Sequence, residues 1–504
     1  MTVAPDSAGR LCADRGTCGH CGSGVATPVR VAVPLLAIVA LAFAACHPAA
    51  AAHTAPASPT RSTTPPAMAL VGGTLLNPNQ PPVRDATILI REGRVVCAGP
   101  RAACPVAQDV SVMDIRGTFI APGFIDAHVH YAQSGWVDSR PDAFDLRQEF
   151  PHESAMAVLE REPERFDRAF LCAGVTSILD AGGYAWTLSL ARLREGALPA
   201  PRVAAAGPIF LTRDSRLNRW LNFPTLPMFV VMTDDSTVRA AVRTTAAMGA
   251  QAIKIGYLTA ADSVQALPLI AAAAEEAQTA GLPIIVHVQH VAGTKQVLRA
   301  GARVLVHVVT PEEMDEELIE LVRASGAIVV PSLTVFEGYS DLYNGRSPAG
   351  RYPLDCVEPG IRAQLESPLT LEVREPRLSS VAVYDTLVAA GIRNVRRLHE
   401  AGIPIAVGTD AGNPGTAHGP SIYREMELLH AAGMTAEEVF AAATIGGARA
   451  LGRAHELGSL EPTKLADAVI FDADPTVDVR NARRVRMVMK GGALFTREEL
   501  TRRR

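Results

Sequence analysis

The sequence predicts an α/β protein: a (β/α)8 barrel of the TIM type, with a small discontinuous β-sandwich domain formed by the segments that flank the barrel. Three features of the 504 residues lead to this prediction. Eight short apolar segments recur through the middle of the chain, several follow Ala-rich runs that end in Gly, and both ends carry short alternating segments broken by Gly and Asn. Strands that alternate with helices build parallel barrels, whereas closely spaced short strands build sandwiches.

The eight apolar segments are the expected barrel strands. They begin near residues 123, 175, 201, 250, 282, 302, 326 and 403 and read GFIDAHVH, VTSILDAG, PRVAAAG, AQAIKIG, LPIIVHV, ARVLVHV, GAIVVPSLT and IPIAVGTD. The runs LPLIAAAAEEAQTAG before Leu282 and VRRLHEAG before Ile403 are typical of helices that end at Gly. Eight βα units close a barrel whose active site lies at the carboxyl ends of its strands.

Short segments near both ends predict a β-domain made of two pieces. ALVGGTLLNP and ATILIREGRVVCAG open it near residue 68, and DAVIFDADP and RRVRMVMKGGALF have the same character near the C-terminus. The expected divisions are an N-terminal extension with an export signal (1–46), a flexible linker rich in Ala, Pro, Ser and Thr (47–67), the first part of the β-sandwich (68–120), the barrel (121–452), and the second part of the sandwich with the tail (453–504).

The N-terminal region predicts export. Arg30 precedes an apolar run, Val31–Ala45, that is shorter than the roughly 20 residues of a membrane span and suits the hydrophobic region of a signal peptide. The run ends at Cys46 after two alanines and resembles a bacterial lipobox, which implies lipidation of Cys46. We expect an exported protein, either a lipoprotein anchored in the membrane by its lipid alone or, if an ordinary signal peptide is cleaved nearby, a periplasmic protein.

Composition restricts the partners. The net charge is −4, and Lys and Arg form no dense block before the terminal RRR, so nothing supports a nucleic-acid partner. We expect a small-molecule or short-peptide substrate and a homo-oligomer.

Cys97 and Cys104 either close a small disulfide loop, as an exported protein allows, or remain two free thiols.

Metal-ligand residues stand at the ends of several predicted strands. His128 and His130 are two apart, so in a strand both imidazoles face the same side, although two ligands alone make a weak metal site. The remaining candidates are Lys254 in the fourth strand, His287 in the fifth, His307 in the sixth and Asp410 in the eighth. Each has an ordinary structural explanation, but together they predict a metal site at the carboxyl end of the barrel.

These motifs resemble the amidohydrolase superfamily of metal-dependent hydrolases, in its binuclear, dipeptidase- and imidazolonepropionase-like branch. APGFIDAHVH looks like the metal motif of the first strand and GTDAG like that of the eighth. HGPSIYREMELLHAAGMTAEEVFAAATIGGARALG and LGSLEPTKLADAVIFDADP are similar to the C-terminal passage of these enzymes. The resemblance covers about residues 70 to 495.

The resemblance implies two divalent metal ions, with Zn²⁺ as the first choice, and a carbamylated lysine. One ion would take His128, His130, Asp410 and carbamylated Lys254, and the other would take the second carbamate oxygen, His287 and His307. A hydroxide held between the ions would attack an amide carbonyl while Asp410, as the catalytic residue, passes its proton to the leaving nitrogen. The expected function is hydrolysis of a C–N amide bond, in dipeptides or N-acyl amino acids.

Two other hypotheses about the function stay open. A mononuclear deaminase or cyclic-amide hydrolase would use the same barrel without Lys254, and a non-catalytic surface lipoprotein would not use the site at all. Candidate substrate contacts are Tyr257, His290 and His418. Two long stretches, 131–170 and 334–390, interrupt the βα rhythm and are expected to roof the site; they contain Trp136, Arg140, Arg147, Tyr339 and Tyr343.

Overall fold

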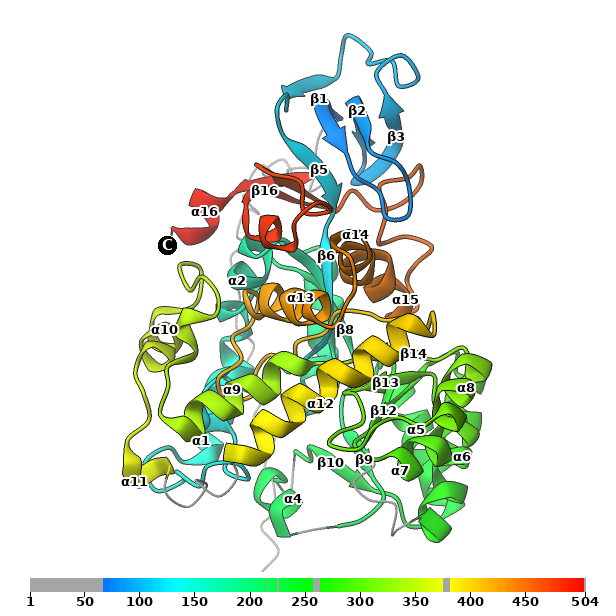
Figure 1. Ribbon diagram of the computed structural model, residues 1–504, viewed down its shortest axis with the longest axis vertical. Coiled ribbons are helices and arrows are strands. Elements are labelled where there is room, and N and C mark those ends of the chain that lie inside the picture. Colours follow the sequence, from blue (N-terminus) through cyan, green and yellow to red (C-terminus); the bar gives the residue numbers. More distant parts are fainter. Residues whose placement is uncertain (1–66, 215, 224–225, 257–262, 375–380, 503–504) are drawn as a thin grey trace, which may run out of the picture. The chain divides into compact units, whose positions relative to one another are not determined.

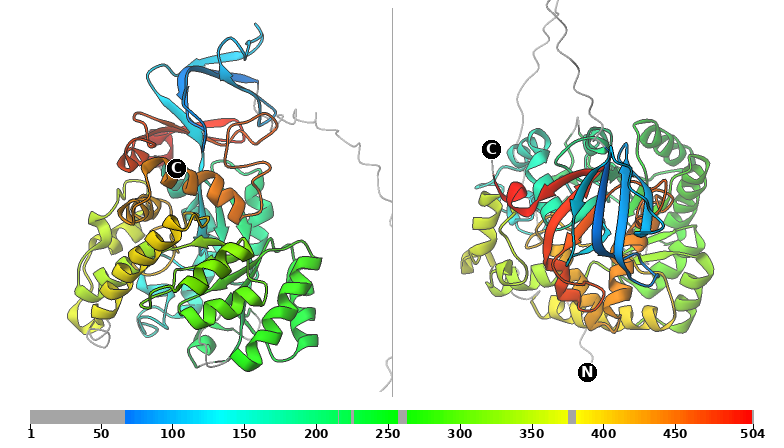
Figure 2. Two further views of the ribbon diagram at one scale, coloured as in Figure 1. Left: turned by 45° about the vertical axis from the view of Figure 1, so that its right-hand side comes forward. Right: turned by 90° about the horizontal axis from the view of Figure 1, so that it is seen from above.

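Strands from the two ends of the described chain share one eight-stranded sheet. Its order is β17-β16-β15-β5-β1-β2-β3, with β4 paired to β1. The strands are β1 (Met68–Leu75), β2 (Val83–Arg91), β3 (Arg94–Pro100), β4 (Ser111–Asp114), β5 (Phe119–Pro122), β15 (Ala468–Phe471), β16 (Val485–Lys490) and β17 (Ala493–Thr496). Figure 2 shows the N-terminal strands beside the C-terminal ones. The computed structural model describes residues 67–502 except 215, 224–225, 257–262 and 375–380, all within the unit Ser62–Arg504.

Local sequence explains this sheet. Alternate residues of β2, such as Ile88 and Ile90, are buried in a cluster that also contains Leu70 and Ile470. The turn between β2 and β3 has φ of 49° at Glu92 and 72° at Gly93, and two successive positive φ angles characterise the type I′ turn of a tight hairpin. The expected pairing of segments from the two ends of the chain is present, since β5 pairs with β15 in this one sheet.

Two further sheets are parallel throughout. One has the order β6-β7-β8 and the other β10-β9-β11-β12-β13-β14. The strands are β6 (Phe124–Val129), β7 (Val175–Asp180), β8 (Arg202–Ala205), β9 (Ile209–Leu211), β10 (Phe229–Val231), β11 (Ile253–Gly256), β12 (Ile284–His287), β13 (Val304–Val306) and β14 (Ile328–Val330). The backbone N–H of Gln251 donates to the Ala205 carbonyl at 2.9 Å, which links β8 to the segment before β11.

The eighth predicted strand, 403–410, is not a regular strand. Ile405 forms an isolated bridge with Val329 of β14, and Ala411 forms another with Val129 of β6, so this segment lies between the two sheets. Backbone hydrogen bonds join it to both neighbours, from the Ala406 N–H to the Val329 carbonyl and from the Ala127 N–H to the Val407 carbonyl, each at 2.9 Å. Asp126 also accepts hydrogen bonds from the backbone N–H and the hydroxyl of Thr409, at 2.9 and 2.7 Å. The other seven predicted segments contain strands, and β9 and β10 are additional strands that we did not predict.

Helices follow or separate these strands (Figure 1). They are α1 (His152–Arg161), α2 (Asp167–Cys172), α3 (Thr187–Glu195), α4 (Arg216–Leu221), α5 (Asp235–Ala247), α6 (Ser263–Thr279), α7 (Val291–Arg299), α8 (Glu316–Ser325), α9 (Leu333–Asn344), α10 (Pro359–Glu366), α11 (Leu371–Arg374), α12 (Val381–Glu400), α13 (Ser421–Ala431), α14 (Ala436–Ala441), α15 (Gly447–Ala450) and α16 (Arg497–Thr501). The long helix α12 packs against α9, and α13 also contacts α9. No helix of the described part of the chain is long and apolar enough to cross a membrane.

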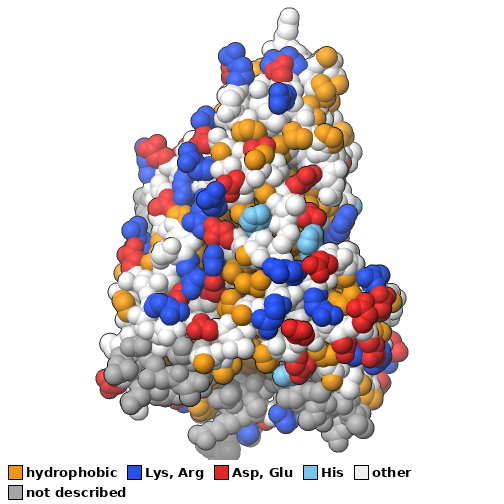
Figure 3. All heavy atoms as spheres, viewed as in Figure 1, with side chains coloured by type: hydrophobic (Ala, Val, Ile, Leu, Met, Phe, Trp, Pro, Cys, Tyr) orange, Lys and Arg blue, Asp and Glu red, His pale blue; other side chains and the backbone are white. Residues whose placement is uncertain are grey.

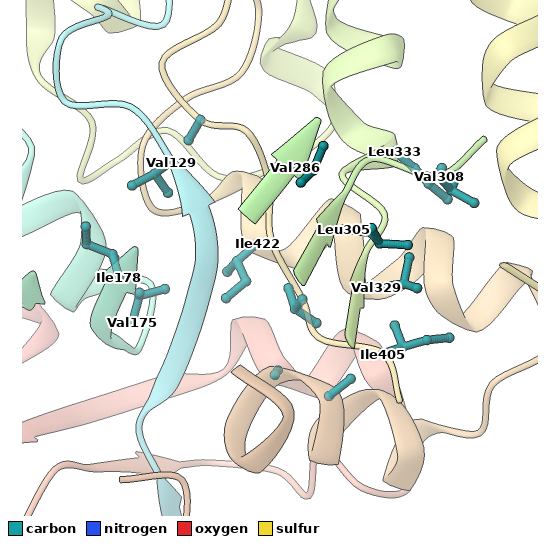
Figure 4. Close-up of a cluster of buried hydrophobic side chains, with 14 of the residues drawn as sticks. Val129, Val175, Ile178, Val286, Leu305, Val308, Val329, Leu333, Ile405 and Ile422 are labelled. Atoms are coloured by element: carbon teal, nitrogen blue, oxygen red, sulfur yellow. The ribbon is translucent and has the colours of Figure 1, made fainter. Parts of the chain in front are cut away.

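The parallel strands bury side chains on both faces. Val286, Leu305 and Val329 belong to the larger buried cluster, part of which Figure 4 shows. Their strand neighbours, such as Ile285 and Val306, belong to a separate cluster. Successive strand residues point to opposite faces, so the two clusters lie on opposite sides of the strands.

Two disulfides join segments of the described chain. Cys97 is bonded to Cys104, which decides between the two alternatives left open by the sequence. Cys172, the last residue of α2, is bonded to Cys356 in the segment before α10. Residues 1–66, with the expected export signal, Cys46 and the linker, lie outside the described residues, and the expected domain limits remain predictions.

Candidate active site

Strand alternation brings Lys254 and His287 to the same face of their sheet. In β11 the flanking Ile253 and Ile255 belong to the larger buried cluster, so Lys254 between them points to the opposite face. Lys254 pairs in register with Ile285, and Gly256 pairs with His287 at the end of β12. His307 follows directly after β13, the next strand. Three of the predicted ligands thus come from neighbouring parallel strands.

His128, His130 and Asp410 form a tight group. Their side chains are buried, and the ligand-capable atoms of the three residues lie within 4.8 Å of one another. Asp410 Oδ1 is 3.4 Å from His128 Nε2 and 3.0 Å from His130 Nε2. His128 lies in β6, His130 directly follows β6, and Asp410 lies in the segment that takes the place of the eighth strand, as the order of the motifs predicts.

The hydrogen bonds of this group suit a cation. His130 Nδ1 lies 2.6 Å from the Gly182 carbonyl, which can only accept, so this nitrogen donates and Nε2 is the ring nitrogen that faces Asp410. Asp410 Oδ1 and His307 Nδ1 are buried and have no hydrogen-bond partner among the described residues. A buried carboxylate oxygen without a hydrogen-bond donor is costly, and a divalent ion bound at this group would satisfy it.

His287 and His307 lie beside this group. Their ring centroids are 4.5 Å apart, and His307 Nε2 is 3.6 Å from Asp410 Oδ2. Burial lowers the pKa of His307 to about 4 and holds the pKa of His287 well below its ordinary value. Both imidazoles are therefore neutral at pH 7, the form that binds metal ions.

Lys254 is a buried lysine beside these residues. Burial lowers its pKa to about 7, although the nearby Asp410 carboxylate opposes this change. A substantial fraction of Lys254 is then an uncharged amine at neutral pH. An uncharged amine is the form that reacts with CO₂ to give a carbamate, so Lys254 has the protonation that the predicted modification needs.

The group lines a cavity of 390 Å³. All six predicted metal ligands line it, together with Arg140, Tyr339 and Tyr343 from the two stretches expected to form a roof. The remaining described lining residues are Gln133, Asp142, Ala143, Ile209, Leu211, Asn218, Leu221, Met228, Phe229, Gly256, Gln289, Val335, Phe336, Tyr384 and Asn413. Trp136 and Arg147 line a neighbouring cavity instead.

The three residues predicted to contact the substrate lie in different places, and none is among the described residues that line the cavity. Tyr257 lies outside the described residues. His290 is partly exposed before α7, with Nδ1 3.4 Å from a Glu312 oxygen, and is not among the described lining residues. His418 is buried, lies 3.0 Å by Nε2 from the His130 carbonyl and stacks on Phe166 at 3.8 Å, so it supports the backbone of a predicted ligand and is likewise absent from the described lining.

Two supporting residues were not predicted. Ser332 Oγ lies 2.9 Å from His128 Nδ1, and the Asn413 amide donates to the Asp410 carbonyl at 3.1 Å. Both follow the carboxyl end of a predicted strand, which is the only sequence signal that marks them. Hydrogen bonds of this kind orient the residues that bind a metal.

Comparison with known proteins agrees with this geometry. An imidazolonepropionase of Geobacillus thermodenitrificans (strain NG80-2) is 26% identical over 457 residues, covering 82% of this chain and 91% of that protein. Another, of Geobacillus kaustophilus (strain HTA426), is 43% identical over 110 residues, covering 21% of this chain and 26% of that protein.

Solved structures show the same fold at low identity. A Xaa-Pro dipeptidase with bound methionine has a TM-score of 0.64 at 22% identity, covering 85% of this chain and 100% of that chain. The A. niger ochratoxinase has a TM-score of 0.65 at 22% identity, covering 86% and 96%. These likenesses imply a TIM-barrel-type α/β fold. The profile of the Amidohydrolase family matches residues 119–494, and the chain therefore belongs to this family of hydrolases that act on carbon–nitrogen bonds.

Proposed function

We propose that the protein hydrolyses the amide C–N bond of a small molecule in a metal-dependent reaction, a substrate range that includes dipeptides and N-acyl amino acids. The observation that carries this proposal is the buried group of His128, His130 and Asp410, whose ligand-capable atoms lie within 4.8 Å of one another and line a cavity of 390 Å³. The imidazolonepropionase relatives and the dipeptidase-like fold support an amide bond as the target.

Named residues of this chain would hold the metal. His128, His130 and Asp410 would take one ion, and His287 and His307 would take a second, with Lys254 between them as a carbamate. Divalent ions bound there, of which Zn²⁺ suits this donor set best, would lower the pKa of a water molecule and polarise the amide carbonyl. Asp410 would accept the proton of the attacking water and deliver it to the leaving nitrogen, which would leave as an amine while the acyl group becomes a carboxylate.

A mononuclear centre is the second candidate, and one observation favours it. Within the described residues, the ligand-capable atoms of His128, His130 and Asp410 all lie within 4.8 Å of one another, and neither His287 nor His307 belongs to this group. A mononuclear deaminase or cyclic-amide hydrolase would need only such a centre. The number of bound ions per chain separates the two candidates.

Export remains part of the proposal. The apolar run before Cys46 supports a lipid anchor in the membrane or secretion into the periplasm, and a homo-oligomer is expected. Cys46→Ala should release the protein from the membrane fraction or stall its processing. A native protein that is wholly soluble, with Cys46 unmodified, would show that the anchor is wrong.

The activity is tested by assaying the purified protein against dipeptides, N-acyl amino acids, N-acyl amines and cyclic amides, before and after metal chelation. Amide hydrolysis that is lost on chelation and restored by Zn²⁺ is expected. Release of ammonia from an aminated ring, with no amide hydrolysis, would instead establish the deaminase.

A further inference from the structure

One wall of the cavity is aromatic and continuous with the metal-ligand residues. Phe336, Tyr339 and Tyr343 lie on one face of α9 because they are spaced at three and four residues. The Phe336 ring centroid is 5.9 Å from that of His307. Tyr384 of α12 extends the wall, 5.1 Å from Tyr339 and 5.3 Å from Tyr343 between ring centroids. Four rings thus lead away from the predicted metal centre.

Apolar side chains supply much of the remaining lining. Leu211, Leu221, Met228 and Phe229 come from the region of β9, α4 and β10 and line the same cavity. A cavity of 390 Å³ is within the range of roughly 300–1,000 Å³ for small-molecule sites. Aromatic and aliphatic walls favour an apolar group by removing its surface from water.

The charges of the cavity wall cancel locally. Apart from the six predicted ligands, the charged residues in the described lining are Arg140 and Asp142. Arg140 donates to both carboxylate oxygens of Asp142, from Nε at 2.8 Å and from Nη2 at 2.7 Å. Its Nη1 donates to Gln133 at 3.3 Å and to Asn413. Four of the five guanidinium N–H groups are therefore engaged within the protein.

This pairing determines how the wall treats a substrate carboxylate. Asp142 neutralises Arg140, the cation that would otherwise bind the substrate carboxylate. The Asp142 carboxylate would also repel the substrate carboxylate. An unpaired carboxylate is costly to bury. We propose that, within the proposed range of amides, the cavity prefers those that carry an uncharged aromatic group, N-acyl arylalkylamines for example, over the carboxylate-bearing N-acyl amino acids and dipeptides, and that Asp142 sets this preference. The proposal rests on the proposed amide hydrolysis, in which Lys254 is an anionic carbamate.

Matched substrates test the proposal in the full-length wild-type enzyme. N-acetyl-2-phenylethylamine and N-acetylphenylalanine differ only by the carboxylate, and N-ethylacetamide lacks the ring. On the acyl side, N-methyl-4-methylbenzamide and its 4-carboxy counterpart form the same comparison. We expect kcat/KM to be about tenfold higher, or more, for the uncharged aromatic member of whichever pair is cleaved, because the charged member must bury a carboxylate without a partner. The kcat/KM of the uncharged aromatic member should also exceed that of N-ethylacetamide.

Asp142→Asn provides the second arm, because it leaves the Arg140 charge uncompensated at almost unchanged shape. This variant should lower the preference for the uncharged member about tenfold. Asp145→Asn is the matched control. Asp145 also accepts from an arginine two residues away, Arg147, whose Nε and Nη2 are both at 2.7 Å, but neither residue lines this cavity. Asp145→Asn should retain the wild-type preference.

The outcomes are distinct. Equal or better hydrolysis of the carboxylate-bearing members by the wild type overturns the proposal, as does an Asp142→Asn preference equal to that of Asp145→Asn. Cleavage of dipeptides but of no aromatic amide overturns it and leaves the proposed function standing. Hydrolysis of no amide at all contradicts the proposed function and removes the basis of this proposal with it.

Discussion

His307, Ser332 and Asp410 have φ of 66°, 52° and 57°, in the left-handed region that residues other than Gly rarely adopt. His307 and Ser332 follow the parallel strands β13 and β14, and Asp410 ends the segment that takes the place of the eighth strand. Such backbone costs about 1–3 kcal/mol per residue and persists where surrounding contacts enforce it. Here the contacts include the Ser332 hydroxyl at His128 and the Asn413 amide at the Asp410 carbonyl. At the scale of single residues, the site is held by hydrogen bonds that orient its imidazoles and carboxylate.

Ser332→Ala tests this orientation. The variant keeps the backbone preference of a residue with a Cβ but removes the oxygen at His128 Nδ1, so metal affinity should fall about 10- to 100-fold. Competition with a chromophoric chelator measures the affinity. Ser325→Ala, which removes a hydroxyl bonded to the Val322 carbonyl at the end of α8, should leave it unchanged. Equal affinities in the two variants would assign Ser332 no part in the site.

Lys254→Ala tests the carbamate. Loss of a bridging ligand should reduce hydrolysis by several orders of magnitude, and acetate or propionate at high concentration should partly restore it by supplying the missing oxygens. Short amines should not. Rescue by amines alone would instead indicate a cationic Lys254 that pairs with a substrate carboxylate, and an unchanged rate would favour a mononuclear centre.

At the scale of elements, the parallel strands explain why the site was predictable. His287 ends β12 and His307 directly follows β13, the neighbouring parallel strand, so the two residues lie at the same edge of the sheet. The segment 403–410 was predicted as a regular strand but makes only isolated bridges. The sequence did not reveal this irregularity, because the hydrogen bonds that Thr409 donates to Asp126 join residues 283 apart in sequence. Ser332 and Asn413 carry no motif that sequence could reveal, since their roles depend on the backbone turn after each strand.

Glu425 of α13 couples two helices and gives a prediction for pH. Its carboxyl accepts from the backbone N–H groups of Leu333 and Thr334, at 3.0 and 2.8 Å, in the first turn of α9. Burial raises its pKa from the ordinary 4.5 to about 8, against the effect of these hydrogen bonds. Between these values the folded chain holds a proton that the unfolded chain has lost. Stability from this group is complete below about pH 4.5 and is lost as pH rises through 8.

The free energy of unfolding should therefore fall by about 1.4 kcal/mol per pH unit between pH 6 and 7 on account of Glu425, and less steeply as pH approaches 8. Denaturant titrations at several pH values measure this slope. Glu425→Gln, which cannot ionise, should remove that part of the slope, whereas Glu437→Gln, at an exposed position of α14, should retain it. A slope that is identical in wild type and Glu425→Gln would refute the prediction.

At the scale of the whole molecule, residues far apart in sequence close the site. The stretches around Arg140 and Tyr339 were recognisable as interruptions of the βα rhythm, and both line the cavity. Which side chains enter the cavity was not predictable, because the stretches contain little regular periodicity and are positioned by long-range contacts. One of these is the Cys172–Cys356 disulfide, which ties the segment after α9 to α2.

On the face shown in Figure 3, Lys, Arg, Asp and Glu side chains intermingle without a broad patch of one sign.

The disulfide gives a prediction for stability. Cys172 and Cys356 are 184 residues apart in sequence, and closing so long a loop restricts the unfolded chain by an amount worth about 2–5 kcal/mol. Replacing both residues with Ser should lower the free energy of unfolding by that amount under non-reducing conditions. The double replacement of Cys97 and Cys104, which are only 7 residues apart, should cost less. The reverse order would show that loop closure is not the source of the stability.

The most direct test of the whole account is to measure divalent metal per chain and amide hydrolysis together, by plasma mass spectrometry and a coupled assay, in wild type and His128→Asn. The account predicts about two ions per active wild-type chain and a parallel loss of metal and hydrolysis in His128→Asn, since this residue lies at the centre of the candidate site. About one ion per fully active chain would replace the binuclear centre with a mononuclear one. Full hydrolysis by a protein stripped of metal would contradict the central claim.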